Sequence, residues 1–560
     1  MCRQSGKMAP SLPEHLDRAP GRFERSPNHW TERLPANSNT SGSSSIWTHL
    51  LFPPVADLIF LVLAFSWSCG ALASRLLNDA GIGWHIRNGE LILQTHSIAR
   101  TDPFSSTMQG QPWYAWEWLY DVLIAAIHHR LGLNGVALFT AIIIATTFAL
   151  TFRLMQARGG NLPVNVVLLL LAVGASTIHF LARPHIVSWL FAILWFQLLD
   201  LSETRPLTAR RLFWLPVLTL LWVNLHGGFL VGFALLGIYM LSAAVRWLTS
   251  LDLAERKNAI SALRRLATVT AACLLASLVN PHGYKLHVHV YQYLTNRFLM
   301  NHIEEFLSPN FHGVPQQCFA LLLLISLAAL ALRRGPLRPS QLLVVLFAAY
   351  SGLYAARNLP LSSILLCLVI APWLGDIIGN AAASEEIRPG LRGLFQRVKS
   401  FSLRMDSVEA GARAHLWPAV GVVFLCATAI NGGRLGGDQL MSAHFSAQRF
   451  PVQAIDMVRE QGIAGPIFCP DSWGGYLIYR LYPQTKVVLD DRHDLYGAQF
   501  LKDYLKVIHV EPGWDRVLEQ KQVNWVLVPL GSPLGGVLRE SSGWKVLHED
   551  NTAVLFKRAG

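Results

Sequence analysis

The chain has 560 residues, of which 52% are hydrophobic and only 15% charged, whereas soluble domains carry about 25% charged residues. This composition excludes an ordinary soluble protein and indicates a polytopic membrane protein. The net charge of +12 does not indicate a nucleic-acid partner, because the basic residues lie between apolar runs, where they set orientation in the membrane. Seven cysteines without a CxxC pair indicate neither a disulfide framework nor a zinc site.

The beginning of the chain differs in composition from the rest. It is rich in Pro, Ser, Asn and Arg, and it is too long and too polar for the n-region of a signal peptide. We therefore expect residues 1–48 to form a disordered cytoplasmic tail.

Residues 49–432 contain a succession of apolar runs, most of them able to cross the roughly 30 Å of hydrocarbon in a bilayer. The sequence predicts an α-helical transmembrane domain here, with eleven spans. The predicted spans cover residues 53–74, 133–155, 163–182, 186–200, 211–226, 228–248, 266–280, 317–333, 340–357, 359–378 and 415–432.

The segment 116–132 (WEWLYDVLIAAIHHRLG) is apolar on one face and charged on the other, so we interpret it as a helix at the membrane interface. The distribution of basic residues supports this choice. With eleven spans and a cytoplasmic N-terminus, the inner segments hold 25 Lys and Arg residues and the outer loops between the spans hold 8. A twelfth span would place basic segments outside, against the positive-inside rule.

Residues 445–560 follow the last span and are predicted to form an α/β domain outside the cytoplasm. PVQAIDMVREQG has the pattern of an amphipathic helix, and PIFCP, KVVLD, NWVLVP and AVLFK have that of short strands. Strands that alternate with helices indicate a small α/β sandwich. The turn DDRHDLYG after KVVLD could mark a site at a strand end, and turn chemistry with a local Asp–Arg pair explains it equally well.

The long first outer loop, residues 78–132, concentrates ionisable side chains beside the membrane. Asp79, His85, Asp102 and Glu117 all lie in it. Its aromatic stretch WYAWEWLY suits the depth of lipid headgroups, so the loop would hold carboxylates at the bilayer surface. A carboxylate there can take a proton from an acceptor hydroxyl in a displacement at a sugar carbon.

Polar residues also recur at the outer ends of the predicted spans, in RPH, NLHGG, NPHGYKLHVH, EEFLSPNFH and ARNLP. Ionisable residues beside a membrane are costly and tend to face a cavity, so these segments predict one polar cavity on the outer face. Helix capping explains most of the Gly and Pro residues there, but it explains Arg183, His226, His282 and Arg357 less well. Arg183, His282, Lys285 and Arg357 could stabilise a phosphate leaving group.

The chain resembles the GT-C superfamily of membrane glycosyltransferases, and within it a group of bacterial proteins. The resemblance rests on the number of spans, an acidic residue just after the first span, an amphipathic helix in the first outer loop and a soluble C-terminal domain. It implies that Asp79 is the counterpart of the first-loop catalytic carboxylate of the family. The matching phrases are DAGIGWHIRNGE, ARTDPFSST, QPWYAWEWL, ARPH, NLHGGF, NPHG, FLSPNFH, FPVQAIDMV and SWGGYLIYRLYP with VVLDDRHDLYG.

These observations lead to one main hypothesis. The chain would be a glycosyltransferase of the bacterial inner (plasma) membrane, with a cytoplasmic N-terminus and an extracytoplasmic C-terminal domain. It would move a sugar from a polyprenyl-phosphate donor to a lipid, glycan or protein acceptor, by a single inverting displacement. Asp79 would be the base, and Asp102 and Glu117 would orient the acceptor or hold the loop. The residues predicted to bind substrate are His85, Arg183, His226, His282, Lys285 and Arg357.

The sequence does not establish a cofactor. Asp79, His85, Asp102 and Glu117 could together hold a divalent ion such as Mg²⁺ or Mn²⁺, but their spacing matches no compact metal motif. Two other functions stay open: a transporter or lipid-handling protein, and a non-catalytic membrane scaffold. Polar residues that gather at one surface, with no paired charges in mid-span, disfavour transport.

Overall fold

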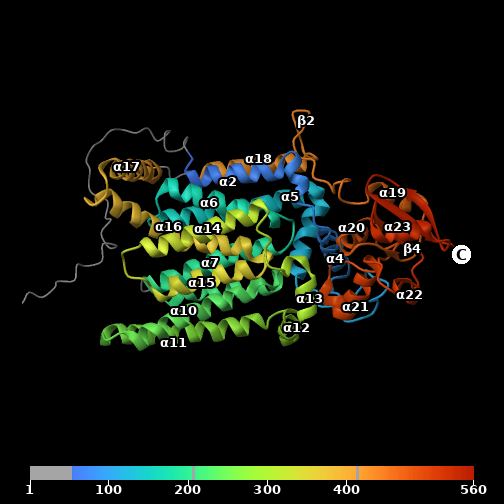
Figure 1. Cartoon of the computed structure of the whole chain (residues 1–560), viewed down its shortest axis with the longest axis horizontal. Helices are drawn as coiled ribbons and strands as arrows, with labels where there is room; N and C mark the ends of the chain where they lie inside the picture. Colours follow the sequence, from blue (N-terminus) through green and yellow to red (C-terminus); the bar gives the residue numbers. More distant parts are fainter. Residues whose placement is uncertain (1–52, 205–208, 412–414, 560) are drawn as a thin grey trace, which may run out of the picture. The chain divides into compact units, whose positions relative to one another are not determined.

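The computed structural model describes residues 53–204, 209–411 and 415–559. The predicted tail over residues 1–48 lies outside these ranges. The described residues belong to one compact unit, in which long apolar helices precede a small sheet near the C-terminus (Figure 1).

The first part of the described chain is helical because its segments are rich in Leu, Ala and Val, with Pro in the first turn of α6, α14, α15 and α16. Its elements, in chain order, are α2 (Val55–Ser68), α3 (Ala71–Arg75), α4 (Gly81–Thr95), α5 (Trp118–Ala157), α6 (Leu162–Ser176), η1 (Thr177–His179), α7 (His185–Thr204), α8 (Ala209–Leu212), α9 (Trp214–Leu225), η2 (Gly227–Phe229), α10 (Leu230–Thr249), α11 (Leu253–Ser277), α12 (Tyr284–Thr295), α13 (Arg297–His302), η3 (Glu304–Phe306), α14 (Val314–Leu332), α15 (Pro339–Tyr354), η4 (Ala356–Asn358), α16 (Leu359–Ala383), α17 (Pro389–Gly411) and α18 (Leu416–Ile430).

Seven helical segments in the described ranges are long and apolar enough to cross a membrane, which makes the chain an integral membrane protein. Four further predicted spans fall in the shorter apolar helices α2, α9, α15 and α18, of 14, 12, 16 and 15 residues. A polytopic helical protein is thus confirmed, and the count of eleven spans stays a prediction.

The predicted interfacial helix, from Trp118 onward, and the span after it form the two parts of α5, which are separated by a kink with non-helical backbone at Gly132. Gly132 has φ 60° and ψ −156°, a conformation that glycine adopts easily because it has no Cβ. The chain therefore changes direction where the amphipathic segment gives way to the apolar one, and the interfacial position of the first segment stays a prediction.

The C-terminal part contains a four-stranded sheet in the order β3-β4-β6-β5. Strands β3 and β4 are parallel, and β4–β6 and β5–β6 are antiparallel. The predicted helix PVQAIDMVREQG is present as α19, and β5 was not predicted. The elements are β1 (Arg434–Leu435), β2 (Asp438–Gln439), α19 (Val452–Glu460), β3 (Ile467–Phe468), α20 (Asp471–Leu481), α21 (His493–Ile508), α22 (Trp514–Gln520), β4 (Trp525–Pro529), α23 (Pro533–Glu540), β5 (Trp544–Glu549) and β6 (Ala553–Arg558).

The predicted strand KVVLD does not become a full member of this sheet. Val487 forms isolated bridges with Ile467 of β3 on one side and with Ser105 of the first outer loop on the other. The Ser106 N–H and the Thr107 hydroxyl donate to the carbonyl oxygens of Val487 and Val488, at 2.9 and 2.6 Å. The first loop thus takes the place that a neighbouring strand would occupy, and this joins it to the C-terminal domain.

Helix α4 lies between α5 and α20 at backbone contact distance (Figure 1). A Cβ atom on Gly83 would overlap the carbonyl oxygen of Gly475 in α20, and one on Gly89 would overlap the carbonyl oxygen of Asp121 in α5. Arg87 of α4 also donates two hydrogen bonds to the carbonyl oxygen of Tyr479. Glycine is needed at these positions because the three helices approach too closely for side chains.

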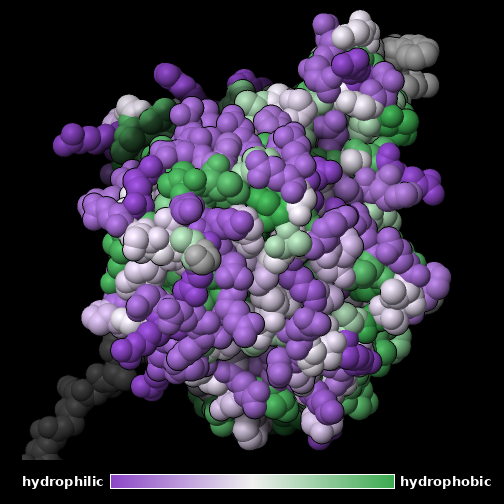
Figure 2. Space-filling model, turned by 90° about the vertical axis from the view of Figure 1, so that its right-hand side faces the viewer, coloured by the Kyte–Doolittle hydropathy of each residue, from purple (hydrophilic) through white to green (hydrophobic). Residues whose placement is uncertain are grey.

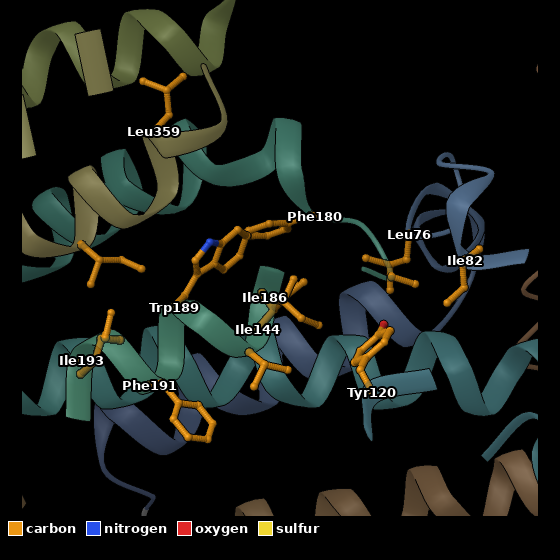
Figure 3. Packing of buried hydrophobic residues seen from close by; sticks show 14 of the residues in the cluster. Leu76, Ile82, Tyr120, Ile144, Phe180, Ile186, Trp189, Phe191, Ile193 and Leu359 are labelled. Carbon is orange, nitrogen blue, oxygen red and sulfur yellow. The ribbon is translucent and has the colours of Figure 1, made fainter. Parts of the chain in front are cut away.

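A continuous apolar core extends from the membrane helices to the C-terminal domain. Figure 3 shows Phe180 and Trp189 side by side in it, with ring centroids 6.2 Å apart. Phe180 also contacts Trp67 and Phe148, so the short segment between η1 and α7 is anchored firmly. Figure 2 views the side that carries α19, α21 and α23 in Figure 1, and this face is mostly hydrophilic, as a domain in water requires.

The close approach of α4 and α20 generates a stability prediction. Gly83→Ala should lower the free energy of unfolding by about 1–3 kcal/mol, because the new methyl group must push the Gly475 backbone away. Gly536→Ala is the matched control: Gly536 lies exposed in α23, and a Cβ there meets nothing within 4 Å. Thermal unfolding of the purified protein in detergent measures both variants, and equal stability of the two would contradict the packing argument.

Candidate functional site

A backbone contact brings Asp79 and Arg183 together at the predicted outer side of the membrane. The Ala182 N–H donates to the carbonyl oxygen of Leu76, at 2.7 Å, so the segment between η1 and α7 lies against the start of the first outer loop. The Arg183 Nη1 then contacts Asp79 Oδ2 at 3.0 Å. The other Asp79 oxygen accepts the Gly81 N–H at 2.8 Å at the beginning of α4, and this orients the carboxylate.

A second carboxylate reaches Arg183 from the C-terminal domain. Asp491 Oδ2 lies 3.5 Å from Arg183 Nη2, and its Oδ1 accepts the indole N–H of Trp84 at 3.0 Å. A Cβ atom on Gly81 would lie 2.6 Å from Asp491 Oδ2 and 2.9 Å from Asp79 Oδ1. The two carboxylates therefore converge above Gly81, and the guanidinium joins them.

The neighbouring Arg492 fixes the turn that carries Asp491. Its guanidinium is 2% exposed, and it pairs with Asp490 at 2.7 Å and with Asp102 at 2.8 Å. The rings of Trp84, Phe104 and Trp113 lie around it, with centroids 4.6–5.8 Å away. Asp102 also accepts hydrogen bonds from the Ser105 hydroxyl and backbone. Asp102 is thus buried in a structural ion pair between the first loop and the C-terminal domain.

Glu117 lies between two histidines. His85 Nε2 is 3.7 Å from Glu117 Oε2, and His226 Nε2 is 3.7 Å from Glu117 Oε1. Each histidine is held through its other ring nitrogen: His85 Nδ1 contacts Asp121 at 2.6 Å, and His226 Nδ1 contacts Ser188 at 2.7 Å. The orientation of both rings toward Glu117 is therefore imposed from behind.

Arg357 forms a third group with Glu305, at 3.3 Å, and its guanidinium lies over the Phe306 ring. Glu305 and Glu117 both raise the pKa of Arg183 electrostatically, which connects this group to the others. We call the whole set the outer polar cluster. Its members are Asp79, His85, Glu117, Arg183, His226, Glu305, Arg357 and Asp491.

Electrostatics in the outer polar cluster follow from burial among many carboxylates. Burial raises the pKa of Glu117 to about 7, against an opposing effect of His85 and with an added effect of Asp121. Burial likewise raises the pKa of Asp491. Arg183 lowers this pKa, and the neighbouring Asp79 and Asp490 raise it further. Burial alone would lower the pKa of Arg183, but the surrounding carboxylates raise it.

The histidines of the cluster are neutral at neutral pH. Burial lowers the pKa of His85 to about 3 and that of His226 to about 3, in the second case with help from Arg357 and Arg183. Glu305 is ionised, because Arg357 and Arg183 lower its pKa to about 2 although burial opposes them. The cluster therefore combines fixed charges with two carboxyls that can exchange a proton near neutral pH.

The structure brings together five of the predicted site residues and places Arg357 beside them. Three others lie elsewhere. Asp102 is in the buried pair described above, and Lys285 is exposed on α12. His282 contacts Arg100 and the ring of Tyr114, and burial, with Arg100, lowers its pKa to about 4. His282 is therefore uncharged at neutral pH and cannot attract a phosphate by charge.

Some members of the cluster were not predicted as site residues. Asp491 stands in the acidic turn DDRHDLYG, whose sequence signal was equally explained as turn chemistry, and Glu305 stands in the outer segment EEFLSPNFH. Asp121, Asn88 and Ser188 support the histidines from behind. Nothing in their local sequence signals that role, because each of these hydrogen bonds joins residues more than 30 positions apart in the sequence.

Of the four predicted metal ligands, Asp79, His85 and Glu117 belong to the outer polar cluster, and Asp102 does not. Within residues 53–204, 209–411 and 415–559, no group of three or more His, Cys, Asp or Glu side chains is arranged to hold a metal ion. Asp79 is engaged by Arg183, Asp102 by Arg492 and His85 by Asp121.

Solved structures of membrane glycosyltransferases resemble the chain over most of its length. The oligosaccharyltransferase of Archaeoglobus fulgidus in its apo form is 12% identical, with 85% of this chain and 69% of that chain covered and a TM-score of 0.50. The same protein tethered to an acceptor peptide is 13% identical, with 87% of this chain and 69% of that chain covered and a TM-score of 0.52. ArnT from Cupriavidus metallidurans in the apo state is 13% identical, with 90% of this chain and 97% of that chain covered and a TM-score of 0.46. No protein-family model and no curated protein sequence matches the chain. The structural match to the oligosaccharyltransferase confirms the GT-C fold.

The buried Arg492 pair generates a second stability prediction. Arg492→Met should lower the free energy of unfolding by about 3–5 kcal/mol, because Asp102 and Asp490 would be left buried without a cation. Arg480→Met is the control, since Arg480 pairs with the half-exposed Asp456 and should cost less than about 1 kcal/mol. Thermal unfolding in detergent compares the two variants. A loss of less than about 1 kcal/mol for Arg492→Met would contradict a structural role of its ion pairs with Asp102 and Asp490.

Proposed function

We propose that the chain is a glycosyltransferase that moves a sugar from a polyprenyl phosphate to a hydroxyl group on the outer face of the membrane. One observation carries the proposal. Carboxylates, arginines and neutral histidines from the first loop, the membrane helices and the C-terminal domain converge at one end of the helices, within a GT-C fold. The acceptor would be a lipid, a glycan or a protein, and the membrane would be the bacterial plasma membrane.

The two arginines suit the donor phosphate. Arg183 and Arg357 keep 25% and 29% of their side chains exposed, so each can still be reached although each is paired. A guanidinium can bind a phosphate through two parallel N–H donors. When the sugar–phosphate bond breaks, charge grows on the departing oxygen, and fixed cations stabilise that charge.

Carboxylates of the cluster suit the acceptor. Asp79, with 23% of its side chain exposed, was predicted to be the base that activates the acceptor hydroxyl. In the structure its carboxylate is oriented by Arg183 and by the Gly81 N–H. The proposal requires Asp79 for the reaction, and it requires one carboxylate of the cluster to accept the proton of the incoming hydroxyl.

The role of Asp79 is tested by the release of polyprenyl phosphate. Purified protein in detergent is incubated with radiolabelled polyprenyl-phosphate glucose, mannose and arabinose in turn, with water as the acceptor. Asp79→Asn should lower the rate of release by about 10²-fold or more, because Arg183 loses its closest partner and the acceptor loses a charged contact.

The control for this experiment is Asp438→Asn, which changes an exposed acid in β2. It should leave the rate unchanged. The wild type should release polyprenyl phosphate with one donor sugar and not with the others. Absence of release with every donor, from protein that elutes as a folded species, would contradict the proposed function.

The contribution of the C-terminal domain is tested separately. Asp491→Asn should lower the rate by about tenfold, because its contact with Arg183, at 3.5 Å, is longer than that of Asp79. Asp503→Asn, farther along α21 and bonded to Gln499, should have no effect. If Asp491→Asn matched the wild-type rate, the C-terminal domain would have no part in the site.

A further inference from the structure

Glu117 differs from the other acids of the outer polar cluster in its partners. Asp79, Glu305 and Asp491 each contact an arginine, at 3.0, 3.3 and 3.5 Å. In the part of the chain that the structure describes, the carboxylate of Glu117 contacts no arginine or lysine within 4 Å and accepts no hydrogen bond. It faces only the two histidine Nε2 atoms, at 3.7 Å, and 14% of its side chain is exposed. Its oxygens are therefore available to a substrate.

The hydrogen bonds of His226 show which of its nitrogens carries the proton. The backbone N–H of Gly228 lies 3.1 Å from His226 Nδ1, and a backbone N–H can only donate. The Ser188 hydroxyl accepts the indole N–H of Trp222 at 2.7 Å, so its own proton is free to be donated to the same Nδ1. Nδ1 is thus the acceptor, and the proton stands on Nε2, directed at Glu117 Oε1.

In His85 the proton and the lone pair are on the opposite nitrogens from those in His226. We assign the proton in the 2.6 Å contact between His85 Nδ1 and Asp121 Oδ1 to the imidazole, and the Asn88 side chain donates to the other Asp121 oxygen. The Nε2 of His85 is therefore an acceptor, and it is fully buried without a hydrogen-bond partner. The ring cannot turn away, because Trp84 stacks on it at 3.6 Å and Tyr120 contacts its edge.

Glu117 is thus flanked by one donor and one acceptor. His226 Nε2–H faces Oε1, where it can donate to the carboxyl. His85 Nε2 faces Oε2, where it can accept a proton from the carboxyl. This arrangement stabilises Glu117 after it has gained a proton on Oε2, and it gives no comparable help to Asp79.

We propose that Glu117 is the general base of the transfer reaction, with His226 and His85 as positioning residues that hold its carboxyl and receive its proton by hydrogen bonding. This inference rests on the proposed function and assigns its proton-transfer step. The orientation of the acceptor, predicted earlier for Glu117, then becomes part of its role as base.

The oxygen of the acceptor hydroxyl forms a bond to the sugar C1, and the bond from C1 to the phosphate oxygen breaks with its electron pair on phosphate. The hydroxyl proton passes to Glu117 Oε2, which then donates a hydrogen bond to His85 Nε2. Arg183, near the phosphate, keeps its charge throughout.

The same geometry argues against a metal ion between the two histidines. A metal at His226 Nε2 would need that nitrogen to be unprotonated, which would put the proton on Nδ1. The Gly228 N–H already points at Nδ1, so the two protons would collide. An imidazole N–H, and not a lone pair, therefore faces Glu117 from this side.

The pH dependence of the wild type is one readout. Because burial raises the pKa of Glu117 to about 7, and because a base must be ionised to act, the rate of release should rise with pH through about 7 and level off above it. The charged and titratable groups that face Glu117 are His85 of α4, Asp121 of α5, Arg183 before α7, His226 after α9, and Asp494 of α21.

The decisive experiment compares Glu117→Gln with the wild type over this pH range, with the three labelled polyprenyl-phosphate sugars and water as the acceptor. Glu117→Gln should lose about 10²-fold or more in rate, and the rise near pH 7 should become smaller, since only Asp491, whose pKa burial also raises to about 7, still titrates there. Glu117→Asp should keep the rise with a reduced rate, because the carboxyl is retained one methylene farther away. Glu90→Gln, in α4 beside Arg87, is the matched control and should keep the wild-type rate and profile.

A positioning role for His226 has its own signature. His226→Asn should shift the midpoint of the pH profile, because the Glu117 carboxyl loses the Nε2–H of His226. The affinity of the protein for polyprenyl phosphate should not change. Infrared difference spectra between about pH 6 and pH 8 give a readout without turnover: the wild type should lose protonated-carboxyl absorption from Glu117 and Asp491, and Glu117→Gln should lack the Glu117 part of it.

The outcomes separate the two proposals. A rate and profile of Glu117→Gln equal to the wild type would overturn the assignment and leave the base to Asp79, with the glycosyltransferase function intact. Loss of wild-type release on chelation, restored by Mg²⁺ or Mn²⁺, with the protonated-carboxyl absorption unchanged in Glu117→Gln, would also overturn it. No release from the wild type with any donor would reject the function and the base together.

Discussion

The rest of the site depends on the ion pairs that the guanidinium of Arg183 forms with Asp79 and Asp491. Arg183 joins Asp79 of the first outer loop to Asp491 of the C-terminal domain, while its own backbone lies between two helices of the membrane part. A planar guanidinium can serve two carboxylates at once, which an ammonium group does less well. The surrounding carboxylates raise its pKa, so its charge is permanent, and every other charge in the cluster is set in relation to it.

The balance of charge around Arg183 bears on how the proposed anionic donor would be bound. With all carboxyls ionised, Asp79, Glu117, Glu305 and Asp491 would outnumber Arg183 and Arg357 by two. The raised pKa values of Glu117 and Asp491 reduce this excess near neutral pH. In the proposed reaction, a proton would arrive on a carboxyl of the same cluster as the phosphate leaves and gains charge. The charge of the whole site would therefore change little during transfer, which would keep the cost of reorganisation low.

Much of this arrangement could be predicted from residue types and their order, and some of it could not. The apolar runs, the side of the polar segments and the chemical nature of Asp79 and Arg183 follow from local pattern. The burial of Asp102 does not, because TDPF has the pattern of a simple turn and its partner Arg492 lies in another domain. The segment KVVLD has the pattern of a strand, but its Val487 forms only isolated bridges, with Ile467 of β3 on one side and with Ser105 of the first loop on the other. Contacts of this kind depend on the tertiary fold.

The contacts that position the site also restrict how it can move. Helix α4 is held against α20 by glycine contacts and by Arg87 on Tyr479, and the Arg492 pair fixes the next part of the loop. The acids at the start and the end of this loop are thus kept at fixed positions relative to Arg183. In the proposed reaction, a site held in this way would be preorganised for the transition state and would adapt poorly to varied acceptors.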